Sequence, residues 1–399
     1  MKADAVLSQS KADGGVDRFV YLDGLRGIAA LCVVVYHYSQ HTDFPVLHQA
    51  SAAVDLFFCL SGFVLAHSYG QRILDGLSFV EYFAKRIVRL YPLFIAGVMI
   101  GLVALVIKTK LGMTDYTYPQ VIFSFVYNAL YIPYLNFNTI AVFGQALRGE
   151  IFPLNPPAWS LFFEMFVSAV FYAAVFASFR NKVILVGLSF LALVVLAFVG
   201  GPPGWGTVNM VGGFPRVTCS FFAGVIIYQY GAQAPWVARF RRAVGKAGST
   251  LGVLIAAAII LLFAWPNDNR IFQVAVLLPL TGCVFIGSMI GTGGRIARVL
   301  TFLGDMSYPM YCLHYPLMSL TEAVSVAAHL NLSNGLVGVV SLALTLGFSL
   351  GLLLFFDIPV RRWLTRQVGR YHAHLVQARA ARRSQPFDVP DDALPLETR

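Results

Sequence analysis

Apolar runs of about 20 residues recur along the chain and are separated by short polar loops. An α-helix needs a run of roughly this length to cross the hydrocarbon core of a bilayer. The runs do not alternate apolar and polar positions as the strands of a membrane barrel would. The pattern predicts an all-α, polytopic integral membrane protein with about ten transmembrane helices. The predicted spans are residues 24–42, 52–69, 87–107, 158–178, 183–200, 211–230, 249–265, 271–291, 305–328 and 335–356.

The composition agrees with a lipid environment. Hydrophobic side chains make up 58% of the 399 residues and charged side chains 12%, whereas a soluble domain carries about 25% charged residues. The net charge of +10 does not indicate nucleic-acid binding, because the basic residues lie in short loops between the apolar runs. We therefore expect membrane lipids, and no nucleic acid, among the partners.

The distribution of lysine and arginine predicts the orientation. With a cytoplasmic N-terminus, 23 of the 29 basic residues lie on the cytoplasmic side, four lie outside and two lie within spans. The positive-inside rule favours this arrangement, which leaves both termini in the cytoplasm. The segment 119–135 is apolar but short and is bracketed by Pro119 and Pro133. Counting it as a span would move every later basic loop outside, so it is interpreted as a re-entrant or interfacial element of an outer loop, 108–157.

Three segments follow from this topology. Residues 1–22 form a cytoplasmic N-terminal segment, 23–365 form the membrane-embedded domain, and 366–399 form a cytoplasmic tail. The tail is rich in arginine and then in proline and aspartate, which predicts a surface helix followed by a partly disordered end. Phospholipid head groups are the expected partners of its arginines.

Ionisable side chains inside predicted spans are the first candidates for chemistry, because they are costly in lipid and usually face a cavity. Arg26 and His37 lie eleven residues apart, so a helix returns them to within roughly 20° of one face, about 16 Å apart along its axis. A guanidinium suits phosphate or carboxylate binding, and an imidazole suits proton abstraction from a hydroxyl. The alternative is that Arg26 anchors the helix at the membrane surface and His37 only bonds a neighbouring helix.

A second basic cluster lies at the cytoplasmic start of the third predicted span. Arg86 and Arg89 share a helix face at i, i+3 spacing. Together with Arg26 they would form a site for a ligand with several phosphates. Anchoring, or contact with anionic lipid, is the structural alternative.

Other polar residues in the spans are candidates for catalysis or for lining a substrate route. Glu164 is the third catalytic candidate, with Arg216 or His37 as its expected partner. Ser307, Tyr311 and His314 recur at helical spacing on one face of a predicted span. Helix packing, an aromatic belt or a structural hydrogen-bond seam would explain the same residues. The candidates for the substrate route are Asp55, Ser61, Trp159, Ser160, Arg216, Ser307, Tyr311 and His314.

The sequence does not indicate a metal site. His37 and His41 have the i, i+4 spacing of two zinc ligands, but no His-Glu-x-x-His motif and no carboxylate or cysteine companion accompanies them. No Asp-x-Asp pair occurs either, so a metal-dependent polyprenyl-phosphate sugar transferase is not indicated.

Six segments together resemble the acyltransferase 3 family of integral membrane O-acyltransferases, and they occur in the family's order. The closing segment has Asp357 where the family often has glutamate. The chain also ends without the extracytoplasmic hydrolase-like domain that some members carry. A separate extracytoplasmic protein that completes the transfer is therefore one of the expected partners. The six segments are YLDGLRGIAALCVVVYHYS at 21–39, FFCLSGFVLA at 57–66, RIVRLYP at 86–92, PAWSLFFE at 157–164, GDMSYPMYCLHYPL at 304–317 and FFDIPVRR at 355–362.

This resemblance implies a membrane-embedded acyltransferase domain over 23–365 in a bacterial inner membrane. It implies transfer of an acyl group, usually acetyl, from cytoplasmic acyl-coenzyme A to a hydroxyl of an extracytoplasmic or lipid-linked glycan. His37 would be the catalytic residue, as a base or a transient acyl carrier, and Arg26 its companion. Arg86 and Arg89 would lie near the coenzyme A site, and Glu164 or Asp55 would orient the imidazole.

A transporter or flippase of lipid-linked saccharide is the main alternative, because it also needs polar residues within its spans. No inverted repeat is evident in the sequence, and the basic cluster is confined to one predicted membrane side. An enzyme would consume acyl-coenzyme A, whereas a carrier would not.

Overall fold

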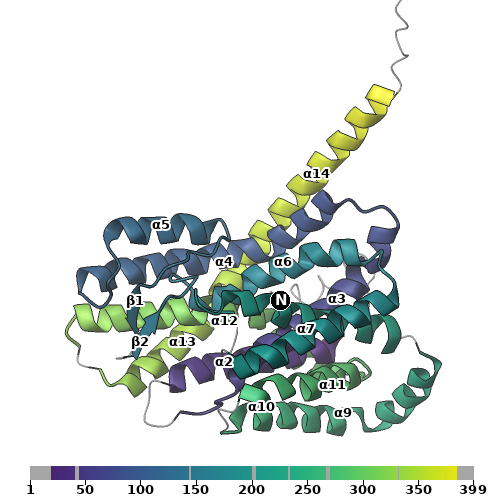
Figure 1. Ribbon diagram of the computed structural model, residues 1–399, viewed down its shortest axis with the longest axis horizontal. Helices are drawn as coiled ribbons and strands as arrows, with labels where there is room; N and C mark the ends of the chain where they lie inside the picture. Colours follow the sequence, from purple (N-terminus) through teal and green to yellow (C-terminus); the bar gives the residue numbers. More distant parts are fainter. Residues whose placement is uncertain are drawn as a thin grey trace, which may run out of the picture.

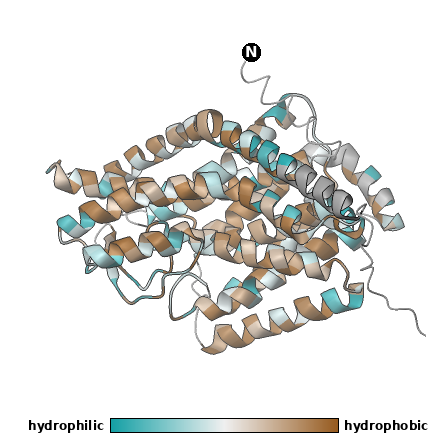
Figure 2. Cartoon of the chain, turned by 90° about the horizontal axis from the view of Figure 1, so that it is seen from above, coloured by the Kyte–Doolittle hydropathy of each residue, from teal (hydrophilic) through white to brown (hydrophobic). Residues whose placement is uncertain are grey.

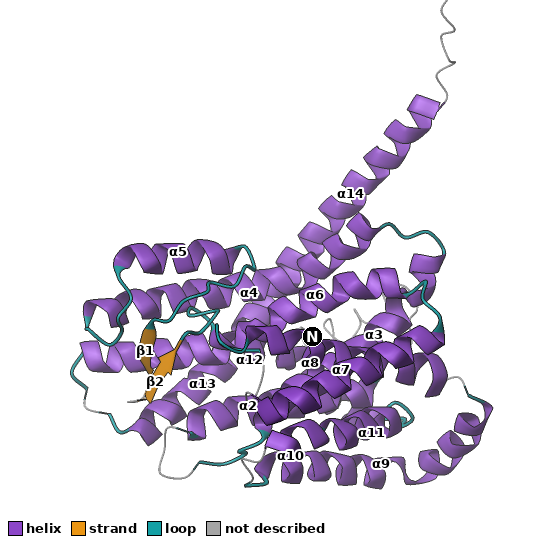
Figure 3. Cartoon of the chain, viewed as in Figure 1, coloured by secondary structure: helices purple, strands orange, loops and turns teal. Residues whose placement is uncertain are grey.

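The fold was analysed in a computed structural model that describes residues 19–40, 45–142, 145–199, 204–231, 234–266, 270–330 and 332–383. Figures 1 and 3 show a bundle of packed helices with a single small hairpin. The prediction of an all-α, polytopic membrane protein is confirmed. The first 18 residues of the predicted N-terminal segment and the last 16 of the tail lie outside the described residues.

The secondary structure follows the chain as long helices joined by short turns. Two five-residue π-helical turns, η5 and η6, continue preceding helices. The elements are α2 (Val20–Ser39), η2 (Ala50–Ala52), α3 (Ala53–Leu74), α4 (Phe79–Lys110), α5 (Tyr118–Ala129), β1 (Thr139–Val142), β2 (Gln145–Arg148), η3 (Pro156–Ala158), α6 (Trp159–Ala174), α7 (Phe179–Val199), η4 (Met210–Gly212), α8 (Gly213–Ile226), η5 (Ile227–Gly231), α9 (Pro235–Ala264), α10 (Arg270–Ala275), α11 (Leu277–Gly287), α12 (Gly294–Ala327), α13 (Asn334–Leu352), η6 (Leu353–Asp357) and α14 (Ile358–Arg383).

Each of the ten predicted spans falls on helical structure. Among the described residues, seven helices are long and apolar enough to cross a membrane, and two shorter apolar helices cover 250–264 and 271–287. The remaining predicted span lies within α12, which begins eleven residues earlier than predicted, at Gly294. Hydrophobic residues dominate the packed helices (Figure 2). The length and hydropathy of the apolar runs therefore located the spans. Several helices are longer than the predicted spans because polar helical turns continue them at one end.

Glycines let neighbouring helices approach at their backbones. A Cβ atom on Gly62 of α3 would collide with the carbonyl of Phe221 in α8, and one on Gly224 of α8 would collide with the carbonyl of Cys59. Similarly, Gly27 of α2 packs on the backbone of Leu303 in α12. Small residues at such crossings are typical of helix association in membranes, where close packing replaces the hydrophobic effect.

The segment after α4 forms a structured loop. Helix α5 lies beside α4 (Figure 1) and has 12 residues, or about 18 Å at 1.5 Å per residue, which is too short to span a bilayer. Strands β1 and β2 follow as an antiparallel hairpin, with Thr139 opposite Arg148. The short helix agrees with the interpretation of 119–135 as an element that does not cross the membrane, whereas the hairpin was not predicted.

A buried ion pair attaches this loop to the bundle. Lys108 Nζ, at the end of α4, lies 2.7 Å from Glu322 Oε2 of α12 and donates a hydrogen bond to the carbonyl oxygen of Ala141 in β1 at 2.9 Å. The Lys108 side chain is fully buried, so its charge requires these partners. The ends of two long helices and the hairpin are thereby held together.

Glu150, just after the hairpin, predicts a pH dependence of stability. Burial raises the pKa of its carboxyl from 4.5 to about 8, so folded Glu150 keeps its proton where the unfolded chain has lost it. Stability is therefore expected to fall as the pH rises from about 4.5 to about 8. Glu150→Gln should flatten this fall, as measured by the thermal unfolding temperature of purified protein in detergent.

Glu81→Gln is the matched control, because Glu81 lies near the surface and is paired with Lys85. It should leave the slope of unfolding temperature against pH unchanged. If Glu150→Gln has the same slope as the wild type between pH 5 and pH 8, then Glu150 is not the group that titrates.

Candidate active site

A cavity of about 330 Å³ lies between the helices and is lined by residues of α2, α3, α4, α6, α12, η6 and α14. Its wall combines apolar side chains, among them Phe57, Leu60 and Val64 of α3, with charged and hydroxyl-bearing side chains. Eight residues singled out from the sequence lie together on it although they come from five helices. They are Arg26, Ser61, Arg86, Arg89, Ser160, Glu164, Ser307 and Tyr311.

Arg26 is held by α12. Its Nε donates to Ser307 Oγ at 2.9 Å and its Nη2 donates to the carbonyl oxygen of Gly304 at 3.1 Å. Asp23, one turn earlier, lies 3.2 Å from Nη2. The guanidinium is therefore fixed against the cavity wall rather than extended along the helix to a membrane surface.

Four arginines line the cavity: Arg26, Arg86, Arg89 and Arg361. Arg361 Nη2 pairs with Asp357 Oδ2 at 2.7 Å across the junction of η6 and α14. Arg89 is exposed and, within the described part of the chain, makes no hydrogen bond or ion pair. Sequence analysis missed Arg361 as a site residue, although it lies in the last of the six motif segments, 355–362.

Glu164 lies on the same wall with partners that differ from those expected. It accepts a hydrogen bond from Arg86 Nη2 at 2.6 Å and a short one from the Ser61 hydroxyl. Neither Arg216 nor His37 supplies the contact predicted from sequence. The expected pairing was wrong because residues at similar depth need not lie on facing helices, and α6 presents Glu164 to α3 and α4.

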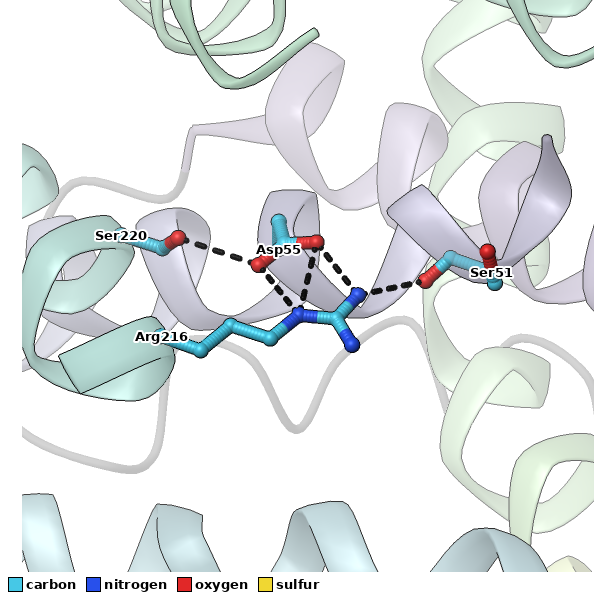
Figure 4. Close-up of polar contacts among 4 residues, drawn as sticks. All are labelled: Ser51, Asp55, Arg216 and Ser220. Carbon is cyan, nitrogen blue, oxygen red and sulfur yellow. Dashed lines mark hydrogen bonds and ion pairs between the residues drawn. The ribbon is translucent and has the colours of Figure 1, made fainter. Parts of the chain in front are cut away.

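Asp55 is instead the partner of Arg216 (Figure 4). Arg216 Nε lies 3.0 Å from Asp55 Oδ1 and Nη2 lies 2.7 Å from Oδ2, while Ser220 also donates to Oδ1. The guanidinium carbon is 5.3 Å from the centroid of the Trp159 ring, within the range of a cation–π contact. Trp159 is thus buried beside an ion pair, and both carboxylate oxygens of Asp55 are bonded to Arg216.

His37 does not line the cavity. Its ring lies 5.2 Å from that of His314 and 5.5 Å from that of Tyr315, measured between centroids. Tyr311 lines the cavity and its ring lies 5.8 Å from His314. The Tyr311 hydroxyl is also hydrogen-bonded to Ser160 at 2.7 Å. Ring contacts from Tyr311 to His314 and from His314 to His37 therefore connect the cavity wall with His37.

The chemistry available is that of anion binding and proton transfer. Among the described residues, no group of three or more His, Cys, Asp or Glu side chains is placed to hold a metal ion. The arginines can bind phosphates or carboxylates, and the apolar side chains of the wall can pack against an extended organic group. The imidazole of His37 can take a proton from a hydroxyl. A ligand with a charged end and an apolar arm fits this arrangement.

Comparison with known proteins identifies the family of the chain. The profile of a family described as an acyltransferase domain matches residues 19–354. "Protein 2 in picA locus" of Rhizobium radiobacter is 36% identical over 45% of this chain and 95% of its own length. "Exopolysaccharide production protein ExoZ" of Rhizobium meliloti is 28% identical over 72% of this chain and 80% of its length.

A third relative is longer than this chain. "Peptidoglycan O-acetyltransferase OatA" of Listeria monocytogenes is 21% identical over 86% of this chain, but the match covers 55% of the listerial protein. No solved structure matches the chain.

The Asp55–Arg216 pair predicts a large loss of stability when one partner is removed. The Asp55 side chain is buried and that of Arg216 is only slightly exposed, so Asp55→Asn leaves the Arg216 charge without the carboxylate it pairs with. Breaking a buried pair in this way costs about 3–5 kcal/mol, and the unfolding temperature of purified protein in detergent should fall accordingly.

The double variant Asp55→Asn/Arg216→Met removes both charges and should recover much of that loss. Equal unfolding temperatures for the wild type and Asp55→Asn would show that the ion pair does not stabilise the fold.

Proposed function

The chain belongs to the acyltransferase 3 family, and from that premise we propose that it transfers an acyl group from cytoplasmic acyl-coenzyme A to a glycan hydroxyl beyond the opposite membrane face. That it is an integral membrane acyltransferase, with an acyl donor and a hydroxyl acceptor, follows from the family and its O-acetyltransferase member. The observation that supports acyl-coenzyme A as donor is the cavity that combines four arginines with an apolar wall.

Coenzyme A carries several phosphate charges at one end and a long, flexible arm at the other. Arg89 has no partner among the described residues, and Arg86 Nε and Arg361 Nε are buried donors without a hydrogen-bond acceptor there. Phosphate oxygens would supply those acceptors through charge-assisted hydrogen bonds. The arm would then lie along α3, whose Phe57, Leu60 and Val64 line the cavity. Acetyl is the acyl group we expect.

His37 is the proposed base. It takes the proton of the acceptor hydroxyl, the hydroxyl oxygen attacks the thioester carbonyl, the carbon–sulfur bond breaks, and the proton passes to the departing thiolate. In the alternative mechanism, His37 itself is the nucleophile and carries the acyl group as an acyl-imidazole. Ring contacts through His314 connect Tyr311 on the cavity wall with His37, and we propose that the acyl group passes Tyr311 on its way to His37.

The contacts of Glu164 support a role for it other than orienting His37. Its bonds to Arg86 and Ser61 connect α6 with α3 and α4. We propose that Glu164 positions Arg86 at the donor cavity rather than orienting His37, and that Arg26 is a further donor-binding arginine.

The proposed membrane is the bacterial inner membrane, with both chain ends in the cytoplasm. The basic loops support this orientation through the positive-inside rule, and it places the arginines of the cavity toward the cytoplasmic pool of donor. The printed names of the relatives concern exopolysaccharide and peptidoglycan. A surface saccharide hydroxyl is therefore the proposed acceptor.

The first test is the ester content of surface polysaccharide in bacterial cells that express the chain. The wild type should add an ester that is visible by mass spectrometry and NMR. His37→Ala should abolish it because the base is lost, and Arg26→Lys should reduce it at matched membrane levels because one ammonium cannot reproduce the paired bonds to Ser307 and Gly304.

His329→Asn is the matched control, since this histidine is exposed at the end of α12. It should retain the full ester content. Undiminished ester in His37→Ala would show that His37 is not the catalytic residue. If purified wild-type protein released no coenzyme A from acetyl-coenzyme A, the proposed donor would be wrong.

Arg89 gives a second test that concerns the donor alone. Loss of one charge-assisted hydrogen bond costs about 1.5–3 kcal/mol, so Arg89→Gln should raise the KM for acetyl-coenzyme A on the order of 10-fold or more while kcat changes little. The measurement is thiol release by purified protein at increasing donor concentration. Arg298→Gln, on the exposed face of α12, should keep the wild-type KM, and an unchanged KM in Arg89→Gln would exclude a phosphate contact there.

A further inference from the structure

The donor cavity ends at one side against Tyr311 of α12. Its described lining includes no residue of α12 beyond Tyr311, none of α6 before Ser160 and none of α3 before Val54. The next residue of α6 in that direction, Trp159, is buried, and so is His314 one turn further along α12. Because Tyr311 and Ser160 are hydrogen-bonded to each other, these limits belong to one end of the cavity.

The arginines lie away from that end. Arg26 bonds α12 at Ser307, which is one turn before Tyr311. Arg86 bonds α6 at Glu164, which is one turn past the first residue that α6 contributes to the wall. With the phosphates of coenzyme A at the arginines, an arm extended along α3 carries its thioester to the opposite end of the cavity.

The Tyr311 side chain is held at its tip and at its edge. Its hydroxyl lies 2.7 Å from Ser160 Oγ and 3.0 Å from the carbonyl oxygen of Pro157. Ser160 Oγ lies 3.0 Å from the same carbonyl oxygen. The ring of Phe57 in α3 stands edge-on to the phenol, with 5.5 Å between the centroids. Contacts with η3, α6 and α3 therefore fix the ring in place.

The protons of the two hydroxyl groups are both used within this cluster. The contact between Ser160 and Tyr311 requires one hydroxyl to donate to the other. The remaining proton has the carbonyl oxygen of Pro157 as its acceptor, since a carbonyl oxygen cannot donate. Neither hydroxyl then has a proton to donate to a ligand in the cavity. The arrangement favours a steric role for Tyr311 over a role as a hydrogen-bond donor to the thioester.

We propose that Tyr311 determines which acyl groups the enzyme accepts, because its clamped ring ends the cavity at the place where the thioester lies. This inference rests on the acyl-coenzyme A function proposed above. An acetyl group has a single methyl beyond its carbonyl carbon and fits against the ring, whereas each further methylene has to displace the clamped phenol. Ser160 is the positioning residue of the ring, since its hydroxyl holds the phenol at its tip.

Removal of the ring should change the choice of donor. Tyr311→Ala is expected to raise the ratio of kcat/KM for butyryl-coenzyme A to kcat/KM for acetyl-coenzyme A on the order of 10-fold or more. The expectation follows because one methylene in a fitted apolar pocket changes specificity by about 10–200-fold. The measurement is thiol release by purified protein with each donor. Each variant is compared with itself, so a smaller amount of active protein cancels in the ratio.

Three further variants separate the bulk of the ring from its hydroxyl group. Tyr311→Phe keeps the ring and should retain most of the preference for acetyl. Ser160→Ala loosens the clamp and should raise the ratio by less than Tyr311→Ala does. Tyr311→Leu fills part of the space and tests the same wall if the alanine variant does not fold. Met318→Ala is the matched control, because this buried side chain lies on α12 outside the described lining of the cavity, and it should keep the wild-type ratio.

A second readout does not depend on turnover. S-ethyl- and S-butyl-coenzyme A are thioethers that cannot transfer an acyl group, and a ligand that binds the folded protein raises its unfolding temperature. In detergent the wild type should be stabilised more by the ethyl thioether than by the butyl thioether at equal concentration. In Tyr311→Ala the butyl thioether should stabilise the protein at least as much as the ethyl thioether.

The outcomes distinguish this inference from the function on which it rests. A wild-type donor ratio in both Tyr311→Ala and Tyr311→Leu would overturn it, as would a wild type that uses both donors equally well. A ratio that rises as far in Tyr311→Phe as in Tyr311→Ala would assign the selection to the hydroxyl group and overturn the steric role. If the proposed function itself is wrong, wild-type protein will release no thiol from either donor and gain no stability from either thioether.

Discussion

The pairing of α2 with α12 is the contact on which the rest of the site depends. Near one end Arg26 bonds Ser307, and near the other Tyr38 bonds the backbone of His314. Gly27 allows the two backbones to approach closely between these points. A slip of one residue would break both sets of bonds and rotate His37 away from α12. Arg26 and His37 are therefore held in one register by a single helix pair.

The membrane spans were predictable because bilayer thickness sets the length of an apolar run. All ten predicted spans fall on helical structure within the described residues, and α5, with 12 residues, is too short to cross a bilayer. The β1–β2 hairpin was missed because its strands have four residues each, too few for a periodic pattern to appear. The early start of α12 was also missed, since hydropathy detects the lipid-facing part of a helix and not its polar extension.

The membership of the site was more predictable than its pairings. Eight of the residues chosen from the sequence share one cavity wall, because ionisable groups in lipid must collect where water or ligand can reach them. The hydrogen-bond and ion-pair partners of these residues depend on which helices face one another. The periodic pattern of hydrophobic residues does not show which helices do so. Glu164 was therefore predicted to pair with Arg216 or His37, whereas it pairs with Arg86 and Ser61. Arg361 follows the last predicted span, and its motif gave no sign that it would line the cavity.

The absence of His37 from the described lining of the cavity has a consequence for the lifetime of a thioester bound by the proposed enzyme. Among the described residues that line the cavity there is no imidazole. In the proposed enzyme, water that enters with the donor would meet arginines, hydroxyls and apolar side chains on the cavity wall. Because the proposed base is not on that wall, hydrolysis of the thioester would gain no catalysis from His37, and the energy of the thioester would be kept for the acceptor.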